Sequence, residues 1–542
     1  MKNYIQKIFI EAEAKLEYLK EVELQLNIPQ EITHGDYSTN IAMLLTKKLK
    51  KNPREIAKTI IDNLNYDSSV ISKIEIAGPG FINFFFMPSF VNRIIKTIGN
   101  EKEHFGKSNK YKGVKANVEF VSANPTGPLT VGHGRNAVLG DTVAKLLEEV
   151  GYDVDREYYF NNAGRQMRVL GNSVAARYAE IIGIEKEFSE EFYQGEYIKD
   201  IARKIFEQYG DKYKDNLEDD IFKDTAEKEI FKDIEKTLEA INIKFNNYFN
   251  ENDLYEKGEI QKLLDFFEKK NLSYKKDGAV WLKLSELGQE VDKVIVKSTG
   301  EPTYRLPDIA YHKSKFDRNY DLIIDIFGSD HNATYPDVLA GIEALGYDKE
   351  KVKVIIYQFV TILEKGQVVK MSTRKANFIT LDELIDEVGK DVVRYFFIMR
   401  NSTSHMNFDL DVAKKNSDEN PVFYLKYAHA RIASILRMTE EQNLKASYDN
   451  LDMLNTETEQ KLIKHLHKYP EEVMLSATNF EPHKLANYLE NLAALFHRFY
   501  TECRIIGSEK ELAEARIALI LAVKTILKNG LNIFSIEAPE KM

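Results

Sequence analysis

Regularly spaced hydrophobic residues in the first hundred positions predict a small α+β module. One helical stripe consists of Ile5, Ile8, Phe9, Ala12, Leu16 and Leu19. A second helix is predicted to begin at Pro53, because Asn52 is a favourable cap and proline suits the first turn. Strands are predicted over 73–77 and 81–86, on either side of a glycine-proline turn. We therefore expect an N-terminal α+β domain over residues 1–99.

The middle of the chain alternates short apolar strands with helices, which predicts a doubly wound parallel sheet of the nucleotide-binding type. The expected strands are 115–123, 158–160, 294–296, 322–327 and 354–357. Within the first, Ala116, Val118 and Phe120 share one face, and Glu119 lies on the other. Ligands bind at the carboxyl edge of such sheets, so residues that follow these strands are candidates for a site.

A long charged run interrupts this alternation. Residues 173–290 are mostly helical in pattern, and only Ala279–Leu282 is expected as a strand. We interpret the run as an insertion between the two halves of a Rossmann-like catalytic domain over residues 115–420, with solvated helices whose charges need no function.

The last part of the chain is predicted to be a helix bundle. Asn420-Pro421 is a turn signal that marks the start of this region. Residues 517–527 are strongly apolar. Before them, a stripe at helical spacing consists of Leu485, Leu489, Leu492, Leu495, Phe496 and Phe499. The expected α-helical domain covers residues 421–542.

Composition limits the class of protein. The chain has 542 residues and a net charge of −10, with one cysteine, Cys503. It has no apolar run that could span a bilayer and no signal-peptide core, so we expect a cytoplasmic protein that does not bind membranes. One cysteine excludes an internal disulfide and a cysteine-rich zinc site. The negative charge argues only weakly against a nucleic-acid partner, because binding depends on a local basic face.

Residues 115–140 hold the most informative pattern, a strand joined to a helix by a glycine-containing loop. Such a junction places backbone N–H groups and a positive helix end where a phosphate can bind. The P-loop pattern is absent, and Gly132, Gly134 and Ala137 match only a loose dinucleotide fingerprint. On these residues alone, an ordinary strand–turn–helix without a ligand remains as good an interpretation.

The order of motifs decides between these interpretations. Pro-Leu-Thr-Val-Gly-His at 128–133 resembles the first signature of class I aminoacyl-tRNA synthetases, His-x-Gly-His, and residues 119–128 are similar to its arginyl version. Val-Val-Lys-Met-Ser-Thr-Arg-Lys at 368–375 resembles the second signature, Lys-Met-Ser-Lys-Ser. Tyr304…Asp308 and Gly328…His331 lie between them in the expected order. The resemblance to arginyl-tRNA synthetases extends over essentially the whole chain.

The resemblance implies a ligase that activates arginine with ATP and transfers it to the 3′ end of tRNA(Arg), with Mg²⁺ accompanying ATP and no zinc. Charge builds on phosphate oxygens in the first step, so catalysis needs placed donors rather than a nucleophile. The implied catalytic residues are His133 and Lys370. The implied ATP-binding residues are Thr130, Gly132, His133, Gly134, Gly328, Asp330, His331, Met371, Ser372, Arg374 and Lys375.

Two positions depart from the family pattern. Thr130 replaces the first histidine of the first signature, and Thr373 replaces the second lysine of the second. Arg374 or Lys375 can substitute for that lysine. Arginyl-tRNA synthetases often lack this second lysine and need bound tRNA to activate the amino acid. The resemblance therefore implies that activation by this chain depends on tRNA. The same departures leave open a tRNA-binding or regulatory paralogue with a weakened active site.

Selection of arginine needs carboxylates that can grip a planar guanidinium. Glu119 and Asp308 are the candidates. The resemblance further implies that Ser122 and Asn124 hold the backbone end of the amino acid and that Tyr304 lines the pocket. If the motifs are ignored, Glu119 is interpreted as a surface residue on a strand edge and Asp308 as a helix cap. Glutaminyl or cysteinyl ligases, and a nucleotide-binding structural protein, are the remaining alternatives.

Two regions resemble tRNA-binding domains of the arginyl family. Gly35–Asn40 is similar to part of the appended domain that touches the outer corner of tRNA, and residues 421–542 are similar to the anticodon-binding domain. Stacking of anticodon bases on aromatic side chains is physically reasonable. The candidates for tRNA contact are Tyr424, Tyr427, His429 and Arg431. Family members are commonly monomeric, so we expect a monomer.

Overall fold

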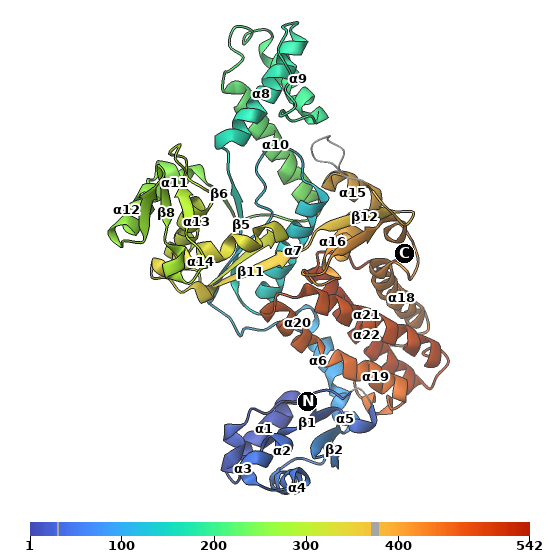
Figure 1. Ribbon diagram of the computed structural model, residues 1–542. Helices are drawn as coiled ribbons and strands as arrows, with labels where there is room; N and C mark the ends of the chain where they lie inside the picture. The colour runs from blue at the N-terminus through green and yellow to red at the C-terminus, as the bar shows by residue number, and fades with distance from the viewer. Residues whose placement is uncertain (30–31, 370–378) are drawn as a thin grey trace.

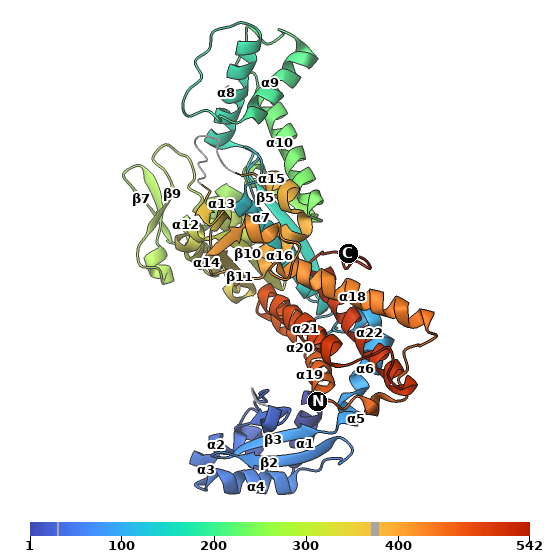
Figure 2. The same cartoon turned by 90° about the vertical axis from the view of Figure 1, so that its right-hand side faces the viewer.

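The computed structural model describes residues 1–29, 32–369 and 379–542. Figure 1 shows four parts: an N-terminal domain, a central α/β body, a C-terminal helix bundle, and a group of helices that projects from the body. The N-terminal domain lies next to the C-terminal bundle, at the opposite end of the molecule from the projecting helices, and Figure 2 shows the same arrangement from the side.

The N-terminal domain packs helices against a three-stranded antiparallel sheet of order β1-β3-β2. Asn52 caps the helix at Pro53 as expected, since its side chain accepts a hydrogen bond from the Arg54 N–H at 2.9 Å. The elements are α1 (Lys2–Ala12), β1 (Tyr37–Thr39), α2 (Ile41–Leu44), α3 (Thr46–Leu49), α4 (Pro53–Asn63), β2 (Ile71–Ala77) and β3 (Phe81–Phe86).

The central body contains a five-stranded, all-parallel sheet of order β11-β10-β4-β5-β6. The strands are β4 (Lys115–Glu119), β5 (Asp153–Phe160), β6 (Asn247–Asn250), β10 (Leu322–Gly328) and β11 (Val352–Tyr357). The connection from β4 leads outward to β5, whereas that from β10 leads outward to β11, so the strand order reverses between β4 and β10. Ligands bind at such a switch point. The expected fold class is confirmed.

Helices cover both faces of this sheet. α7 (Val131–Glu149) lies against the face that carries Phe120, and Gly140 lets it approach, because a Cβ there would overlap with the Phe120 side chain. α13 (Arg305–Asp317) lies against the other face, where Glu119 points. The alternation expected along the first strand is therefore correct, although the strand itself ends at Glu119 rather than at residue 123.

Three further strands differ from the sequence expectation. Val294–Val296 was expected in the parallel sheet, but it belongs to β9 (Lys293–Val296), which pairs antiparallel with β8 (Ala279–Leu282). Together with β7 (Ser273–Lys276) these strands form a separate sheet of order β7-β8-β9. Two strands within the run 173–290, β6 and β7, were not expected. β6 is an edge strand with the sequence Asn-Tyr-Phe-Asn. This sequence has no apolar run that would indicate a strand. β6 interrupts the charged run 173–290 with a strand of the main sheet.

The other elements of the body surround this sheet, and a third small sheet has the order β13-β12-β14. The helices are α8 (Gly164–Ile181), α9 (Glu196–Tyr209), α10 (Ile221–Ala240), α11 (Asn252–Glu256), α12 (Glu259–Lys269), α14 (Tyr335–Ala344), α15 (Leu381–Val388), α16 (Lys390–Ile398) and α17 (Leu410–Ala413). The strands are β7 (Ser273–Lys276), β8 (Ala279–Leu282), β12 (Val360–Glu364), β13 (Gln367–Val368) and β14 (Met406–Asp409).

The C-terminal part is a helix bundle that also holds the connection from the N-terminal domain. Asn92 donates to the carbonyls of Leu451 and Leu454 at 2.7 and 3.2 Å, and His467 donates to the Val91 carbonyl at 2.8 Å. Its helices are α18 (Pro421–Glu441), α19 (Glu457–Leu466), α20 (Tyr469–Thr478), α21 (Pro482–Glu502) and α22 (Lys510–Ile533), preceded in the chain by α5 (Pro88–Val91) and α6 (Arg93–Glu101). Across the described ranges, no helix has the length and apolar character that crossing a membrane requires.

Candidate active site

The candidate site lies at the carboxyl edge of the parallel sheet, beyond the ends of the neighbouring strands β4 and β10. Glu119 is the last residue of β4 and Gly328 the last residue of β10. The chain leaves β4 through backbone that only a few residues adopt readily, with φ of +65° at Val121 and +45° at Ser122. Asn136 on α7 stabilises this exit, because its side chain accepts from the Val121 N–H at 2.6 Å and donates to the Ile326 carbonyl at 2.9 Å.

The first turn of α7 begins in a capping box. The Thr130 side chain accepts from the His133 N–H, and the His133 Nδ1 accepts from the Thr130 N–H at 3.2 Å. A nitrogen that accepts a hydrogen bond carries no proton, so the proton of the neutral ring is on Nε2. Burial lowers the pKa of His133, which also favours the neutral ring. Thr130 therefore begins the helix, and His133 keeps Nε2 as a donor.

The two glycines of this turn differ in their surroundings. A Cβ on Gly132 would meet only the Thr130 Oγ1, at an ordinary 3.6 Å, so the space beside it is open. A Cβ on Gly134 would come within 2.6 Å of Leu381 and 3.0 Å of Phe397. We expected both glycines to admit a nucleotide, but close packing of α7 against α15 and α16 is what requires glycine at 134.

The turn after β10 contributes the next set of expected residues. Gly328 ends the strand, and a 3₁₀ turn over Ser329–Ala333 follows it. A Cβ on Gly328 would come within 2.5 Å of the Asp330 carboxylate, so glycine lets the turn fold back on itself. Asp330 and His331 are both exposed, and the His331 ring stacks on Phe327 with centroids 4.9 Å apart. Both side chains lie at the same sheet edge as Glu119.

Three carboxylates form a row across the sheet below α13. Asp325, Glu119 and Glu157 are register partners on the neighbouring strands β10, β4 and β5, so their side chains lie on the same face. Like charges in such a row are destabilising unless cations compensate them. α13 and the residue after it supply those cations, Lys315, His312 and Arg318.

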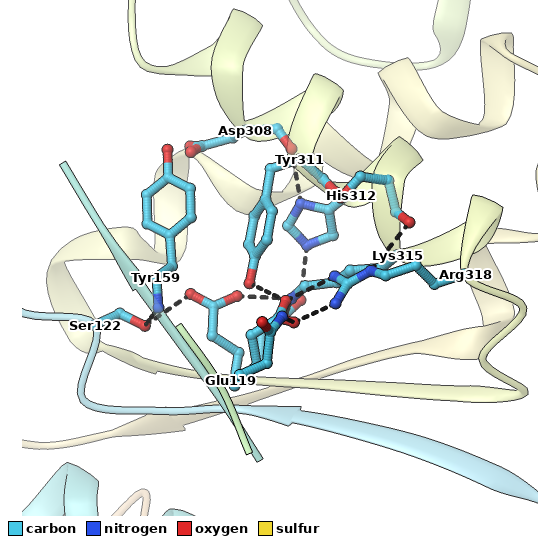
Figure 3. Close-up of polar contacts among 12 residues, drawn as sticks. Glu119, Ser122, Tyr159, Asp308, Tyr311, His312, Lys315 and Arg318 are labelled. Carbon is cyan, nitrogen blue, oxygen red and sulfur yellow. Dashed lines mark hydrogen bonds and ion pairs between the residues drawn. The ribbon is translucent and has the colours of Figure 1, made fainter. Parts of the chain in front are cut away.

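The ion pairs of this row are specific (Figure 3). The Lys315 Nζ lies 2.6 Å from the Glu119 Oε2 and 2.6 Å from the Asp325 Oδ1, and its side chain is 0% exposed. Arg318 donates through both terminal nitrogens to Glu157, which also accepts from the Tyr311 hydroxyl at 2.6 Å. The second oxygen of Glu119 accepts from the Ser122 hydroxyl at 3.0 Å.

His312 completes the network as a cation. Its Nε2 lies 2.8 Å from the Asp325 Oδ2, and its Nδ1 lies 2.8 Å from the Asp308 carbonyl oxygen. A carboxylate and a carbonyl are both acceptors, so the ring must donate from both nitrogens and is protonated. Burial opposes this charge, but Asp325 outweighs it and raises the pKa of His312. The three carboxylates of the row therefore face three cations.

The Asp308 carboxylate, unlike the three carboxylates of the row, is not matched by a cation among the described residues. Among the described residues, no lysine, arginine or histidine forms an ion pair with its carboxylate. Burial, together with Glu119, Glu251 and Asp325, raises the pKa of Asp308 to about 7, against the opposing effect of His312. Figure 3 shows the rings of Tyr159 and Tyr311 standing between Asp308 and Glu119, and the Tyr159 hydroxyl donates to Glu251 at 2.5 Å. Asp308 and Glu251 are therefore two acids without an ion-pair partner among the described residues, and the aromatic rings of Tyr159 and Tyr311 lie beside them.

The other residues expected to bind the amino acid come from the segments that follow β4 and precede α13. The Ser122 hydroxyl donates to Glu119 and accepts a hydrogen bond from the Tyr159 N–H at 3.2 Å. The Asn124 side chain accepts from the Asn161 N–H at 3.0 Å and donates to Gln166 at 3.0 Å. Tyr304 immediately precedes α13 and is 79% exposed, so its ring stands at the rim rather than inside.

The second signature lies outside the described residues. This applies to Lys370, Met371, Ser372, Arg374 and Lys375, and also to Thr373. Their expected roles stay predictions.

Of the four residues expected to contact tRNA, three lie at or near the surface of α18. Tyr427 is 41% exposed, Tyr424 packs on His497 with ring centroids 4.9 Å apart, and Arg431 donates to the Tyr500 hydroxyl at 2.7 Å. The expectation for His429 is contradicted. His429 is 0% exposed, because the end of the chain covers it and its Nδ1 donates to the Pro539 carbonyl at 2.8 Å.

Sequence reasoning missed most of the network. Asn136, Glu157, Tyr159, Glu251, Tyr311, His312, Lys315, Arg318 and Asp325 were not expected at the site. A signal for part of it was present. Asp308, Tyr311, His312 and Lys315 follow i, i+3, i+4, i+7 spacing, which places polar residues on the helix face that normally faces a core.

Known protein families and curated relatives match nearly the whole chain. Family models match three segments: the arginyl tRNA synthetase N-terminal domain at 2–86, the class I (R) tRNA synthetase catalytic domain at 95–409, and the DALR anticodon binding domain at 425–542. An arginine–tRNA ligase from Desulfotalea psychrophila is 50% identical over 520 residues, which is 95% of this chain and 94% of that one. One from Salinibacter ruber is 47% identical, covering 96% of each.

Solved structures share the architecture. The arginyl-tRNA synthetase of Thermus thermophilus superposes with a TM-score of 0.79 over 100% of both chains at 21% sequence identity. At that identity the likeness supports the fold alone.

Proposed function

Because the chain belongs to the arginyl-tRNA synthetase family of class I, we propose that it is an arginine–tRNA ligase that activates arginine with ATP and transfers it to tRNA(Arg). The observation that carries the proposal is the Asp308 carboxylate, which has no ion-pair partner among the described residues, whereas the row Asp325, Glu119 and Glu157 beside it is matched by cations. A guanidinium supplies the missing charge, and its planar fork suits carboxylates. Glu119 offers the second carboxylate, with Ser122, Asn124 and Tyr304 around it.

The nucleotide belongs at the neighbouring end of α7. The positive helix end, the open space beside Gly132 and the Nε2–H of His133 suit the phosphates of ATP. In the first step the arginine carboxylate attacks the α-phosphorus and pyrophosphate leaves. His133 donates to the oxygens on which charge develops, and Lys370 is the expected cation on the pyrophosphate side. We expect Mg²⁺ to enter with ATP and to neutralise phosphate charge there.

Pyrophosphate exchange tests this function. We expect arginine, and none of the other standard amino acids, to support ATP–pyrophosphate exchange, and the exchange to appear only when tRNA(Arg) is present. Exchange with another amino acid would contradict the assignment. No exchange with or without tRNA, while tRNA binding is intact, would favour a paralogue with a weakened site.

The Asp308 carboxyl makes arginine binding pH-dependent. The substrate cation binds the ionised form, so protonation below a pKa of about 7 removes the charge that it meets. We expect kcat/KM for arginine to fall up to about tenfold for each pH unit below that value and to level off above it. The matching profile for ATP, measured at saturating arginine, should lack this step. An arginine profile that is flat across neutral pH would contradict the role of Asp308.

The exposed aromatic residue of α18 gives a separate prediction for tRNA. Replacing Tyr427 by alanine should raise the KM for tRNA about tenfold, because stacking of one base on an aromatic ring is worth about 1–3 kcal/mol. The KM for arginine at saturating tRNA should not change. Leu475→Ala, which removes another exposed side chain of the bundle, is the control. An unchanged KM for tRNA in Tyr427→Ala would rule out this contact.

A further inference from the structure

We propose that Lys315 is the residue that sets the charge and the geometry of the arginine pocket: its ammonium holds the Glu119 carboxylate in place and balances the sheet carboxylates, so that the negative charge left for a guanidinium lies beside Asp308. Lys315 does not touch the substrate in this account, and it acts through Glu119 as a positioning residue. The inference rests on the proposed function, since the readout is arginine binding.

The surroundings of Lys315 leave it no other role. Its side chain is 0% exposed, so it cannot reach tRNA or solvent. Two of the three ammonium protons point to Glu119 and Asp325, each at 2.6 Å. The ammonium also lies 4.4 Å from the centroid of the Tyr311 ring, which favours a cation. All of its interactions thus fix the end of β4 relative to β10 and α13.

The network also connects the two acids that we assign to the guanidinium. From Glu119 it runs through Lys315 to Asp325, then through His312 to the backbone carbonyl of Asp308. The two ends of the pocket are therefore held by one chain of charged hydrogen bonds. A change at Lys315 or Asp325 acts on Glu119 without removing a group that we place against the substrate.

Removal of Lys315 changes the protonation of the pocket. The charged and titratable groups that face Glu119 come from three elements: Asp308, Tyr311, His312 and Lys315 on α13, Asp325 on β10, and Glu157 and Tyr159 on β5. Without the ammonium, Glu119 and Asp325 are neighbouring buried acids, and the remaining cation, His312, pairs with Asp325. Such a pair takes up a proton more readily than a compensated one. Arginine must then displace a second proton in addition to that of Asp308.

The experiment compares two variants, measured by pyrophosphate exchange with tRNA present. Lys315→Met should raise the KM for arginine about 30-fold near neutral pH, because truncating one partner of a buried ion pair is strongly unfavourable. This defect should shrink as the pH rises, because the additional proton is then lost. Asp325→Asn should raise the KM for arginine about tenfold at every pH, since Lys315 then neutralises Glu119 alone. The KM for ATP should stay within about twofold in both variants.

Lys313→Met is the matched control. It makes the same change on the same helix, but Lys313 is paired at the surface with Asp317 and Glu259. It should leave both KM values unchanged. A purely structural role of Lys315 predicts equal losses for arginine and ATP with no dependence on pH, and that result would overturn the inference, as would an unchanged KM for arginine. If Lys315→Met does not fold, a selective arginine defect in Asp325→Asn still supports the inference, and its absence overturns it. Failure of the wild-type chain to use arginine would instead refute the proposed function.

Discussion

Asp308→Asn should lower kcat/KM for arginine about 1000-fold, because it removes a carboxylate that has no ion-pair partner among the described residues and keeps the shape of the side chain. Truncating one partner of a desolvated ion pair costs about 2–5 kcal/mol, and here the guanidinium would be the partner left without its charge. The KM for ATP should change by no more than about twofold, since the phosphates bind at the end of α7. The fall of arginine activity below about pH 7 should also disappear, because its titrating group is gone.

A matched variant separates this effect from damage to α13. Asp317→Asn makes the same change at the end of the same helix, where Asp317 pairs with Lys313 at 2.7 Å on the surface. It should leave the kinetics unchanged, because exposed ion pairs contribute little. Kinetics of Asp308→Asn within about tenfold of the wild type would show that the guanidinium binds elsewhere.

The other candidate acid is less informative when changed alone. Glu119→Gln should also raise the requirement for arginine far more than that for ATP, and equal effects would count against the assignment. The Glu119 carboxylate, however, is also the partner of Lys315. In Glu119→Gln the buried ammonium of Lys315 keeps only Asp325 as an ion-pair partner. Part of any loss in arginine kinetics would therefore come from the changed surroundings of Lys315. Asp308 has no such partner, and its replacement measures the substrate interaction more directly.

The sequence predicted the edge of the site but not its interior. Motif order placed Glu119, His133 and Asp308 in one region, because residues that follow parallel strands gather at one edge. The row formed by Asp325, Glu119 and Glu157 depends on the register of β10, β4 and β5. Spacing along a strand does not encode which residues of neighbouring strands become partners, so the row was not predicted.

Local patterns also failed where tertiary contacts decide the outcome. The alternation of β4 continues past Glu119, but the strand ends there because Asn136 captures the backbone at Val121. Val294–Val296 is apolar enough for a buried strand, yet it packs in a separate antiparallel sheet. His429 lies on a helix whose exposed face carries Tyr427, but the end of the chain covers it. Each difference is a long-range contact that composition and periodicity cannot show.

His133→Ala should reduce kcat about 100-fold, equivalent to ~3 kcal/mol of barrier, with a smaller effect on the KM for arginine. The ring is held in place because its Nδ1 accepts from the Thr130 N–H, which leaves the Nε2–H as the donor toward developing phosphate charge. A donor placed before the reaction begins lowers the barrier without tightening ground-state binding, so the effect belongs in kcat.

Alanine also removes the cap on Thr130, and His133→Asn separates the two functions. The asparagine oxygen can accept from the Thr130 N–H as Nδ1 does, but the shorter side chain has no donor where Nε2 was. If His133 acts on the phosphates, kcat of His133→Asn should be as low as that of the alanine variant while thermal stability returns toward the wild type. If kcat recovers together with stability, the histidine serves only to begin the helix. His104→Ala, a change at an exposed histidine that precedes β4, controls for the loss of an imidazole as such.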